Sequence, residues 1–141
     1  MKNIKEDMIR IYKTYNLDWM NYIITDNDLT YHHIVKIEEG GKTTIDNGAL
    51  LTQRAHNYLN TIEKIDIDIY NRINEILKEI NNNKSEPTKI QRQKIDLLLF
   101  EFEVKNVDKI IKKKEKLGKS RTAVAYMRRI NSQCATNIKK D

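Results

Sequence analysis

Residues 31–60 read YHHIVKIEEGGKTTIDNGALLTQRAHNYLN, and this segment carries all three histidines of the 141-residue chain. His32 and His33 are adjacent, Asn47 follows after 13 intervening residues, and His56 follows after 8 more. Three imidazoles scattered at random would rarely gather within 25 positions. Because imidazole binds metals and exchanges protons near neutral pH, the cluster is a candidate catalytic or metal site.

The local sequence predicts a strand, a loop, a second strand and a helix. Residues 28–37 interleave β-branched and aromatic residues with polar ones, as a strand does. Gly40-Gly41 breaks this pattern, and residues 43–51 can return as the partner strand. Thr52 then suits a helix N-cap, with apolar residues following at helical spacing at positions 55, 59 and 62.

This unit sets a geometric condition on the histidines. His56 projects from the helix toward the hairpin, and Asn60 lies one turn later on the same helical face. His32 and His33 are neighbours on a strand, where successive side chains point to opposite faces. Both can serve one site only if the strand ends or kinks there, which the nearby glycines favour.

Residues 28 to 64 resemble the HNH endonuclease family, which is built on a ββα-metal motif. The family signature is a His-His or Asp-His pair followed, at spacings like those here, by an asparagine and another histidine. The double glycine before Asn47, the apolar run after it and the helix opening before His56 also match. The chain differs from many members at Lys36, where they have proline, and at Asn60, where they have a further histidine. Cysteines of a structural zinc site are often found at the positions of Thr52 and Ala55.

The resemblance implies a role for each matched residue. His32 and His56 would be metal ligands, and His33 would be the general base that takes a proton from the attacking water. Asn47 would hold the loop so that His33 points at that water. Asn60 would complete the coordination of the metal, directly or through a bound water.

The resemblance also implies a divalent metal cofactor. Magnesium or manganese is expected first, as in many family members, and zinc or nickel are alternatives because imidazole favours transition ions. Cys134 is the only cysteine, so a structural cysteine zinc site within one chain is excluded.

Outside the motif the sequence is mostly helical. Amphipathic patterns predict helices over residues 3–16 and 69–80, the second of which either continues the motif helix or stands apart from it. Residues 19–25 fit a helical turn or a short strand, and residues 81–84 read as a loop. Ser85-Glu86-Pro87 reads as the start of a further helix, which continues to residue 117 or breaks between residues 100 and 107.

These patterns together predict a mostly helical α+β fold. A ββα-metal unit is flanked by an N-terminal helix and several C-terminal helices. We expect two regions, an HNH-like unit over residues 1–82 and a basic helical region over residues 83–141. The composition, 39% hydrophobic and 33% charged with no long apolar run, predicts a cytoplasmic protein without a membrane partner.

Positive charge is concentrated at the C-terminus. Residues 105–141 contain twelve Lys and Arg against three Asp and Glu, whereas residues 1–104 contain fourteen against seventeen. Such a basic block suits contact with a phosphate backbone, although a solvated tail would have the same composition. Residues 108–131 resemble a helix-turn-helix, with Gly118 in the turn and Ser120 as cap. The residues that would contact DNA are Lys119, Arg121, Thr122, Tyr126, Arg128 and Arg129.

Two functions from different classes follow. The first is a metal-dependent HNH endonuclease that hydrolyses DNA phosphodiester bonds. The alternative is a catalytically silent HNH-like scaffold of a phage or mobile element, which binds DNA or inhibits another nuclease as a protein partner. The sequence leaves open whether the chain forms a homo-oligomer.

Overall fold

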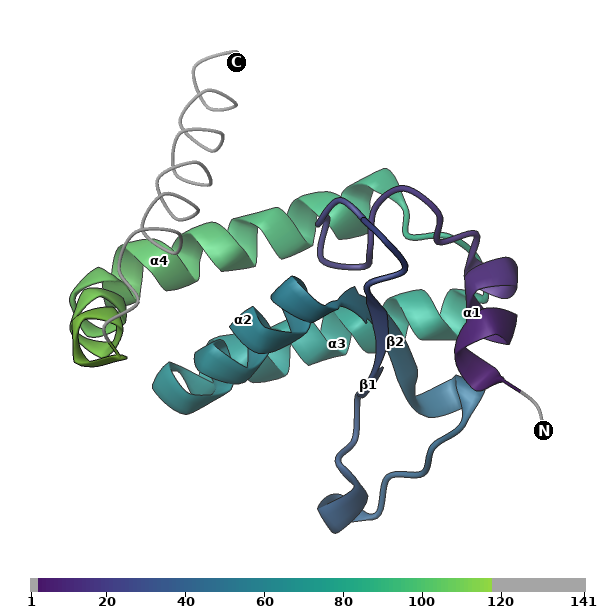
Figure 1. Cartoon of the computed structure of the whole chain (residues 1–141), viewed down its shortest axis with the longest axis horizontal. Helices are drawn as coiled ribbons and strands as arrows, with labels where there is room; N and C mark the ends of the chain where they lie inside the picture. The colour runs from purple at the N-terminus through teal and green to yellow at the C-terminus, as the bar shows by residue number, and fades with distance from the viewer. Residues whose placement is uncertain (1–2, 118–141) are drawn as a thin grey trace.

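The chain folds as a short hairpin packed among helices, as shown by the computed structural model in Figure 1, which describes residues 3–117 and the side chains up to residue 112. The mostly helical α+β fold predicted from the sequence is confirmed. In chain order the elements are α1 (Ile4–Tyr12), β1 (Leu29–His33), η1 (Ile37–Glu39), η2 (Ile45–Asn47), β2 (Gly48–Thr52), α2 (Gln53–Ile65), α3 (Ile67–Asn83) and α4 (Lys89–Leu117).

The two strands pair antiparallel, from Leu29 opposite Thr52 to His33 opposite Gly48. Both are shorter than the sequence predicted, and β1 ends at His33 itself. One further hydrogen bond, from Ile34 N to the backbone oxygen of Asn47 at 2.9 Å, joins the two segments beyond His33, after which the chain leaves the sheet. His32 and His33 are thus consecutive residues of the paired strand, and whether both serve one site stays a prediction.

The predicted cap of the motif helix is confirmed, because Thr52 Oγ1 accepts a hydrogen bond from Ala55 N at 3.2 Å. This helix does not continue into the next one. Asp66 ends α2 and also begins α3, where its side chain accepts from Ile69 N at 3.3 Å. Only one residue therefore joins α2 to α3.

The predicted loop over residues 81–84 is wrong, because α3 runs on through Asn83 and ends at Lys84 in the left-handed conformation. The reason is tertiary. Asn81 is fully buried, and its amide donates to Ile45 O and Gly48 O, both at 2.7 Å. Tyr12 Oη in turn donates to Asn81 O at 2.8 Å. A residue type common in loops thus joins α1 and α3 to the start of β2.

The N-terminal helix is also shorter than predicted, since it ends at Tyr12 with Lys13 in the left-handed conformation. The chain then turns through residues 14–24, with one isolated bridge between Leu17 and Ile23. The buried carboxylate of Asp18 fixes this segment, since it accepts from Thr52 N at 2.7 Å and from Met20 N at 2.8 Å. The ambiguous stretch is therefore a turn bound to the end of β2.

The last helix lies along α2 and α3 (Figure 1). The prediction that it begins at Ser85 is wrong. It begins at Lys89, because Thr88 and Gln91 cap it reciprocally, with Gln91 N to Thr88 Oγ1 at 3.1 Å and Thr88 N to Gln91 Oε1 at 2.9 Å. The expected break is present, since Asn106 has non-helical φ and ψ of −122° and 19°.

The core lies among the hairpin and helices α2, α3 and α4. Its fully buried members include Leu50, Leu59, Ile73, Leu77 and Phe102. The predicted boundary at residue 82 falls beside the turn between α3 and α4, and the division into two regions stays a prediction. In the part of the chain that the structure describes, no helix is both long and apolar enough to cross a bilayer.

Asn81→Ala should lower the free energy of unfolding by about 2–4 kcal/mol, because two carbonyl groups lose their donor at a buried position. Asn82→Ala, one residue further along the exposed side of α3, is the matched control and should change it by less than about 0.5 kcal/mol. Urea denaturation followed by circular dichroism measures both. Equal effects of the two substitutions would contradict the role given to Asn81.

Candidate active site

The rings of His32 and His56 meet between β1 and α2. Their centroids lie 5.3 Å apart and their planes are nearly perpendicular, at 82°. His32 is 4% exposed, and His56 is half-buried. The structure thus brings together the two residues that the resemblance names as metal ligands.

Hydrogen bonds fix which nitrogen of each ring carries the proton. Thr30 Oγ1 donates its only proton to Leu51 O at 2.8 Å, so it can only accept from His56 Nδ1, at 2.9 Å. Asn74 Oδ1 likewise accepts from His32 Nε2 at 2.9 Å. The lone pairs are therefore on His56 Nε2 and His32 Nδ1.

Both imidazoles are neutral at physiological pH. The pKa of His32 falls from 6.5 to about 4, chiefly because burial penalises the charged ring. The Asn74 hydrogen bond and the Glu63 carboxylate oppose this fall, while the charges of His56 and His33 add to it. Burial, and then the charge of His33, also lower the pKa of His56. A neutral imidazole is the form that binds a metal.

The pair fits a divalent ion in its chemistry and in its spacing. Two imidazoles that bind one ion with metal–nitrogen bonds of about 2.1 Å bring their ring centres to about 5 Å. Across the described residues, no group of three or more His, Cys, Asp or Glu side chains is arranged to hold a metal. Of these four residue types, the described chain thus offers the ion only the two imidazoles, and its other ligands would have to be of another kind, such as water.

Asn60 lies one turn beyond His56 on α2 and is exposed to solvent. Glu63 follows on the same helical face and forms an ion pair with Lys36. Lys36 has φ −63° and ψ 149°, a conformation that proline also adopts. The turn therefore accommodates lysine where many family members have proline, and the lysine gives Glu63 its partner.

Asn47 holds the loop that separates the strands. Its side-chain oxygen accepts from Val35 N at 2.8 Å, and its amide donates to Val35 O and Lys42 O, both at 2.9 Å. Both amide hydrogens and the oxygen of this 9% exposed side chain thus bond to the loop backbone.

The double glycine is needed for two different reasons. Gly40 has φ +93°, which only glycine adopts readily. A Cβ on Gly41 would lie 1.8 Å from Val35 O and 2.9 Å from the amide nitrogen of Asn47. Gly41 therefore allows the close approach on which the contacts of Asn47 depend.

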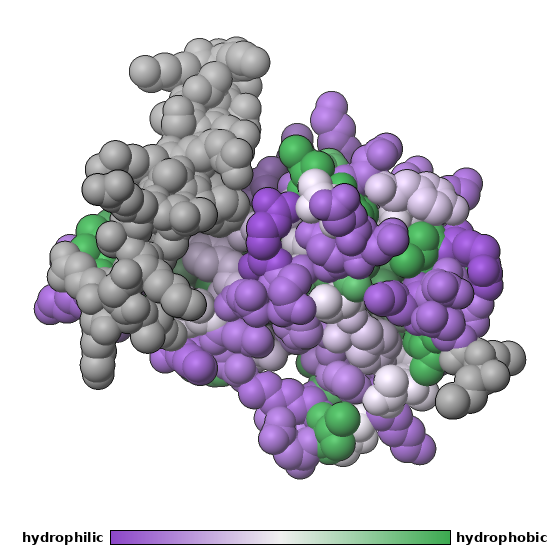
Figure 2. Space-filling view, in the orientation of Figure 1, coloured by the Kyte–Doolittle hydropathy of each residue, from purple (hydrophilic) through white to green (hydrophobic). Residues whose placement is uncertain are grey.

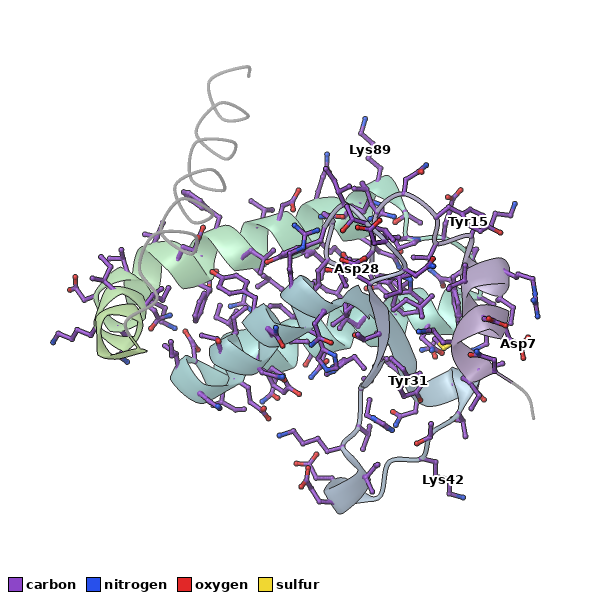
Figure 3. The ribbon with its side chains drawn as sticks, in the orientation of Figure 1. Asp7, Tyr15, Asp28, Tyr31, Lys42 and Lys89 are labelled. Carbon is purple, nitrogen blue, oxygen red and sulfur yellow. The ribbon has the colours of Figure 1, made fainter. Side chains whose placement is uncertain are left out.

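His33 points away from the His32–His56 pair, toward this loop. Its Nε2 lies 2.8 Å from Thr43 Oγ1, and its ring packs edge-to-face on Tyr31 with centroids 4.7 Å apart. Tyr31 Oη donates to Thr44 O at 2.6 Å, which ties the strand to the loop. Tyr31 and Lys42, labelled in Figure 3, mark the strand and the loop that this hydrogen bond joins. His33 remains close enough for its charge to lower the pKa of both other histidines.

The predicted DNA-contacting residues, from Lys119 to Arg129, and most of the predicted helix-turn-helix lie outside the described residues. Within the described part, an apolar patch at the bottom of Figure 2 covers the loop that carries η1, where Val35 is 43% and Ile37 65% exposed.

Sequence reasoning missed four residues around the histidines: Thr30, Thr43 and Asn74, which hydrogen-bond the rings, and Glu63, whose carboxylate raises the pKa of His32. Two of them had a signal. Thr30 precedes His32 by two residues and so shares its strand face, and Glu63 follows His56 at helical spacing. Asn74 comes from a different helix, 42 residues after its partner, and had none.

The HNH endonuclease family model matches residues 19–60. The resemblance predicted from the histidine spacing is thus confirmed for this segment, which begins earlier than expected and includes the turn bound to β2. The match indicates a nuclease-type or DNA-binding function. Comparisons with curated proteins and with solved structures found no match.

Acid should destabilise the metal-free protein through His32. Between pH 6.5 and about 4 the unfolded state binds a proton that the native ring does not, so stability falls by about 3 kcal/mol as the pH drops through this window. Urea denaturation with a chelator, at several pH values, measures this loss. His32→Asn should lose that share of the pH dependence, whereas the control His33→Asn should retain it. An unchanged pH profile in His32→Asn would contradict the assignment.

Proposed function

We propose that the protein is a metal-dependent HNH-type endonuclease that hydrolyses DNA phosphodiester bonds. The observation that carries the proposal is the pair of neutral imidazoles, one buried and one half-buried, each oriented by a hydrogen bond on the nitrogen that would not bind metal. Metal-binding histidines are oriented in this way by partners of their second ring nitrogen. The match of residues 19–60 to the HNH family supports the proposal.

In this proposal His32 Nδ1 and His56 Nε2 hold the cation, and Asn60 or water completes its coordination. Magnesium or manganese is proposed first, with zinc or nickel as alternatives. The bound ion would supply charge stabilisation at the scissile phosphate and at the leaving 3′ oxygen.

His33 is the proposed general base. Thr43 occupies Nε2, so Nδ1, which has no hydrogen-bond partner among the described residues, is the nitrogen that takes the proton from the attacking water. Asn47 acts on this step indirectly, because its hydrogen bonds shape the loop that carries Thr43.

DNA is the proposed substrate, gripped through its phosphates. We propose that the twelve Lys and Arg among residues 105–141 make these phosphate contacts. Because salt screens such charges, high salt would weaken the binding. Contact by Lys119, Arg121 and the other residues of the predicted helix-turn-helix belongs to this proposal.

Purified protein should nick supercoiled plasmid with magnesium or manganese, and His33→Ala should slow the reaction by at least about a hundredfold, the share that a general base contributes. Agarose-gel kinetics with magnesium, manganese, zinc and nickel measure the rate. Calorimetry with manganese tests the metal site separately, since His56→Ala should abolish binding and His33→Ala should leave it. A wild-type protein that shifts DNA but cuts it with none of these metals would favour the silent binding scaffold.

Thr43→Val should lower the cleavage rate by about five- to tenfold, the equivalent of one hydrogen bond of about 1 kcal/mol, because Nε2 of His33 loses its partner. Thr43→Ser should restore the rate. Thr44→Val is the matched control, because Thr44 contacts Tyr31 only through its backbone. Equal losses in Thr43→Val and Thr44→Val would show that the loop tolerates neither change and would remove the specific role of Thr43.

A further inference from the structure

The end of α3 holds the short helix η2, which carries Asn47. Helix α3 passes behind the hairpin and ends next to α1 (Figure 1). Three of its residues, Lys78, Asn81 and Lys84, follow one another at intervals of three, and the side chain of each donates to η2 or to the residue after it. These donors all lie outside residues 19–60, the segment that matches the HNH family.

Both chain neighbours of Asn47 are bound by α3. Lys78 Nζ donates to Asp46 O at 2.9 Å, and the Asn81 amide donates to Gly48 O at 2.7 Å. A residue whose neighbours are both tied to a helix has little freedom to rotate, because each rotation would break a hydrogen bond. The direction of the Asn47 side chain therefore depends on α3.

The ammonium group of Lys84 completes this contact. It lies 2.7 Å from Asp46 Oδ1, 3.0 Å from Asn81 Oδ1 and 3.2 Å from Asn81 O. An ammonium group has three N–H donors, so each of these oxygens can accept from its own donor. The ion pair with Asp46 is exposed and contributes little by itself, so the bonds to the buried Asn81 matter more.

Lys84 also favours one orientation of the Asn81 amide. The amide oxygen faces the ammonium group, so its two N–H groups face the carbonyls of Ile45 and Gly48. The reverse orientation would place N–H groups against a cation and the oxygen against two carbonyl oxygens. Since Asn81 is fully buried, water does not compensate for such contacts. An uncharged side chain at position 84 would remove the preference on one side.

We propose that Lys84 is a positioning residue for the general base of the proposed nuclease. It acts through Asn81 on the residues beside Asn47, and Asn47 in turn shapes the loop that places Thr43 against His33. The inference rests on the proposed function, because that function gives His33 its catalytic role. It also extends the functional unit beyond the family match and past the boundary at residue 82 that the sequence suggested.

Amide hydrogen exchange of the metal-free, full-length chain tests whether Lys84 holds the loop. The reporter is Val35 N–H, which donates to Asn47 Oδ1. Lys84→Met should speed its exchange at least about tenfold relative to that of Leu77 N–H in the core of α3, because the loop then opens locally. Lys13→Met is the matched control and should leave this ratio unchanged, since Lys13 ends α1 in nearly the same left-handed conformation and is exposed. Circular dichroism checks that each variant is folded.

Plasmid nicking and manganese calorimetry test the consequence for catalysis. Lys84→Met should lower kcat about five- to tenfold, the equivalent of one hydrogen bond. It should leave KM for the plasmid and the affinity for manganese unchanged, because the rings of His32 and His56 have their hydrogen-bond partners in Asn74 and Thr30. Lys84→Arg keeps a cation with several donors, and it should restore both the exchange ratio and kcat.

Equal exchange ratios in Lys84→Met and Lys13→Met would overturn the proposal. So would a loss of kcat in Lys84→Met that is matched by an equal loss in Lys13→Met or that Lys84→Arg does not reverse. A wild type that cuts DNA with none of the metals would overturn the proposed nuclease and the catalytic role of Lys84 with it, whereas the exchange ratio would still show whether Lys84 holds the loop.

Discussion

The hydrogen bonds of Asn47 are the contacts on which the geometry of the candidate site depends. Its backbone oxygen accepts the last hydrogen bond between the two segments, from Ile34 N, and its side chain bonds Val35 on one arm of the loop and Lys42 on the other. A buried amide with every group paired has one low-energy orientation, so the loop has one shape. That shape places Thr43 against His33 while leaving His32 on the sheet face that α2 covers.

A second constraint is the burial of His32. A ring with a pKa near 4 resists protonation, so protons compete poorly with a metal for its lone pair in the physiological range. His33 is more exposed and contacts a hydroxyl group and an aromatic edge. Adjacent residues of the same type thus have different environments, which suits one of them to a ligand role and the other to proton transfer in the function proposed here.

Local rules predicted those parts of the structure whose physical cause is local. The N-cap at Thr52, the glycine break and the position of the kink in α4 follow from residue types and spacing. Asn81 was misread because its partners are decided by packing: the asparagines at the end of α3 look like a loop until the carbonyls of Ile45 and Gly48 accept hydrogen bonds from Asn81. The cap formed by Thr88 and Gln91 is local, and it was missed although its spacing is that of a capping box. The strand lengths were overestimated because the chain leaves the sheet at Val35, where the side chain of Asn47 binds the loop backbone at Val35 and Lys42.

A single residue, Asp66, joins α2 to α3. Asp66 ends one helix and caps the next, and Asn106 of α4 donates to the same carboxylate at 2.9 Å. His56 is carried by α2, whereas the partner that orients His32 is carried by α3. A tilt of α3 by a core substitution would therefore rotate one imidazole relative to the other. The angle between the two rings therefore depends on packing far from the site. Substitutions in the core can change the geometry of the imidazole pair without altering any residue of the site itself.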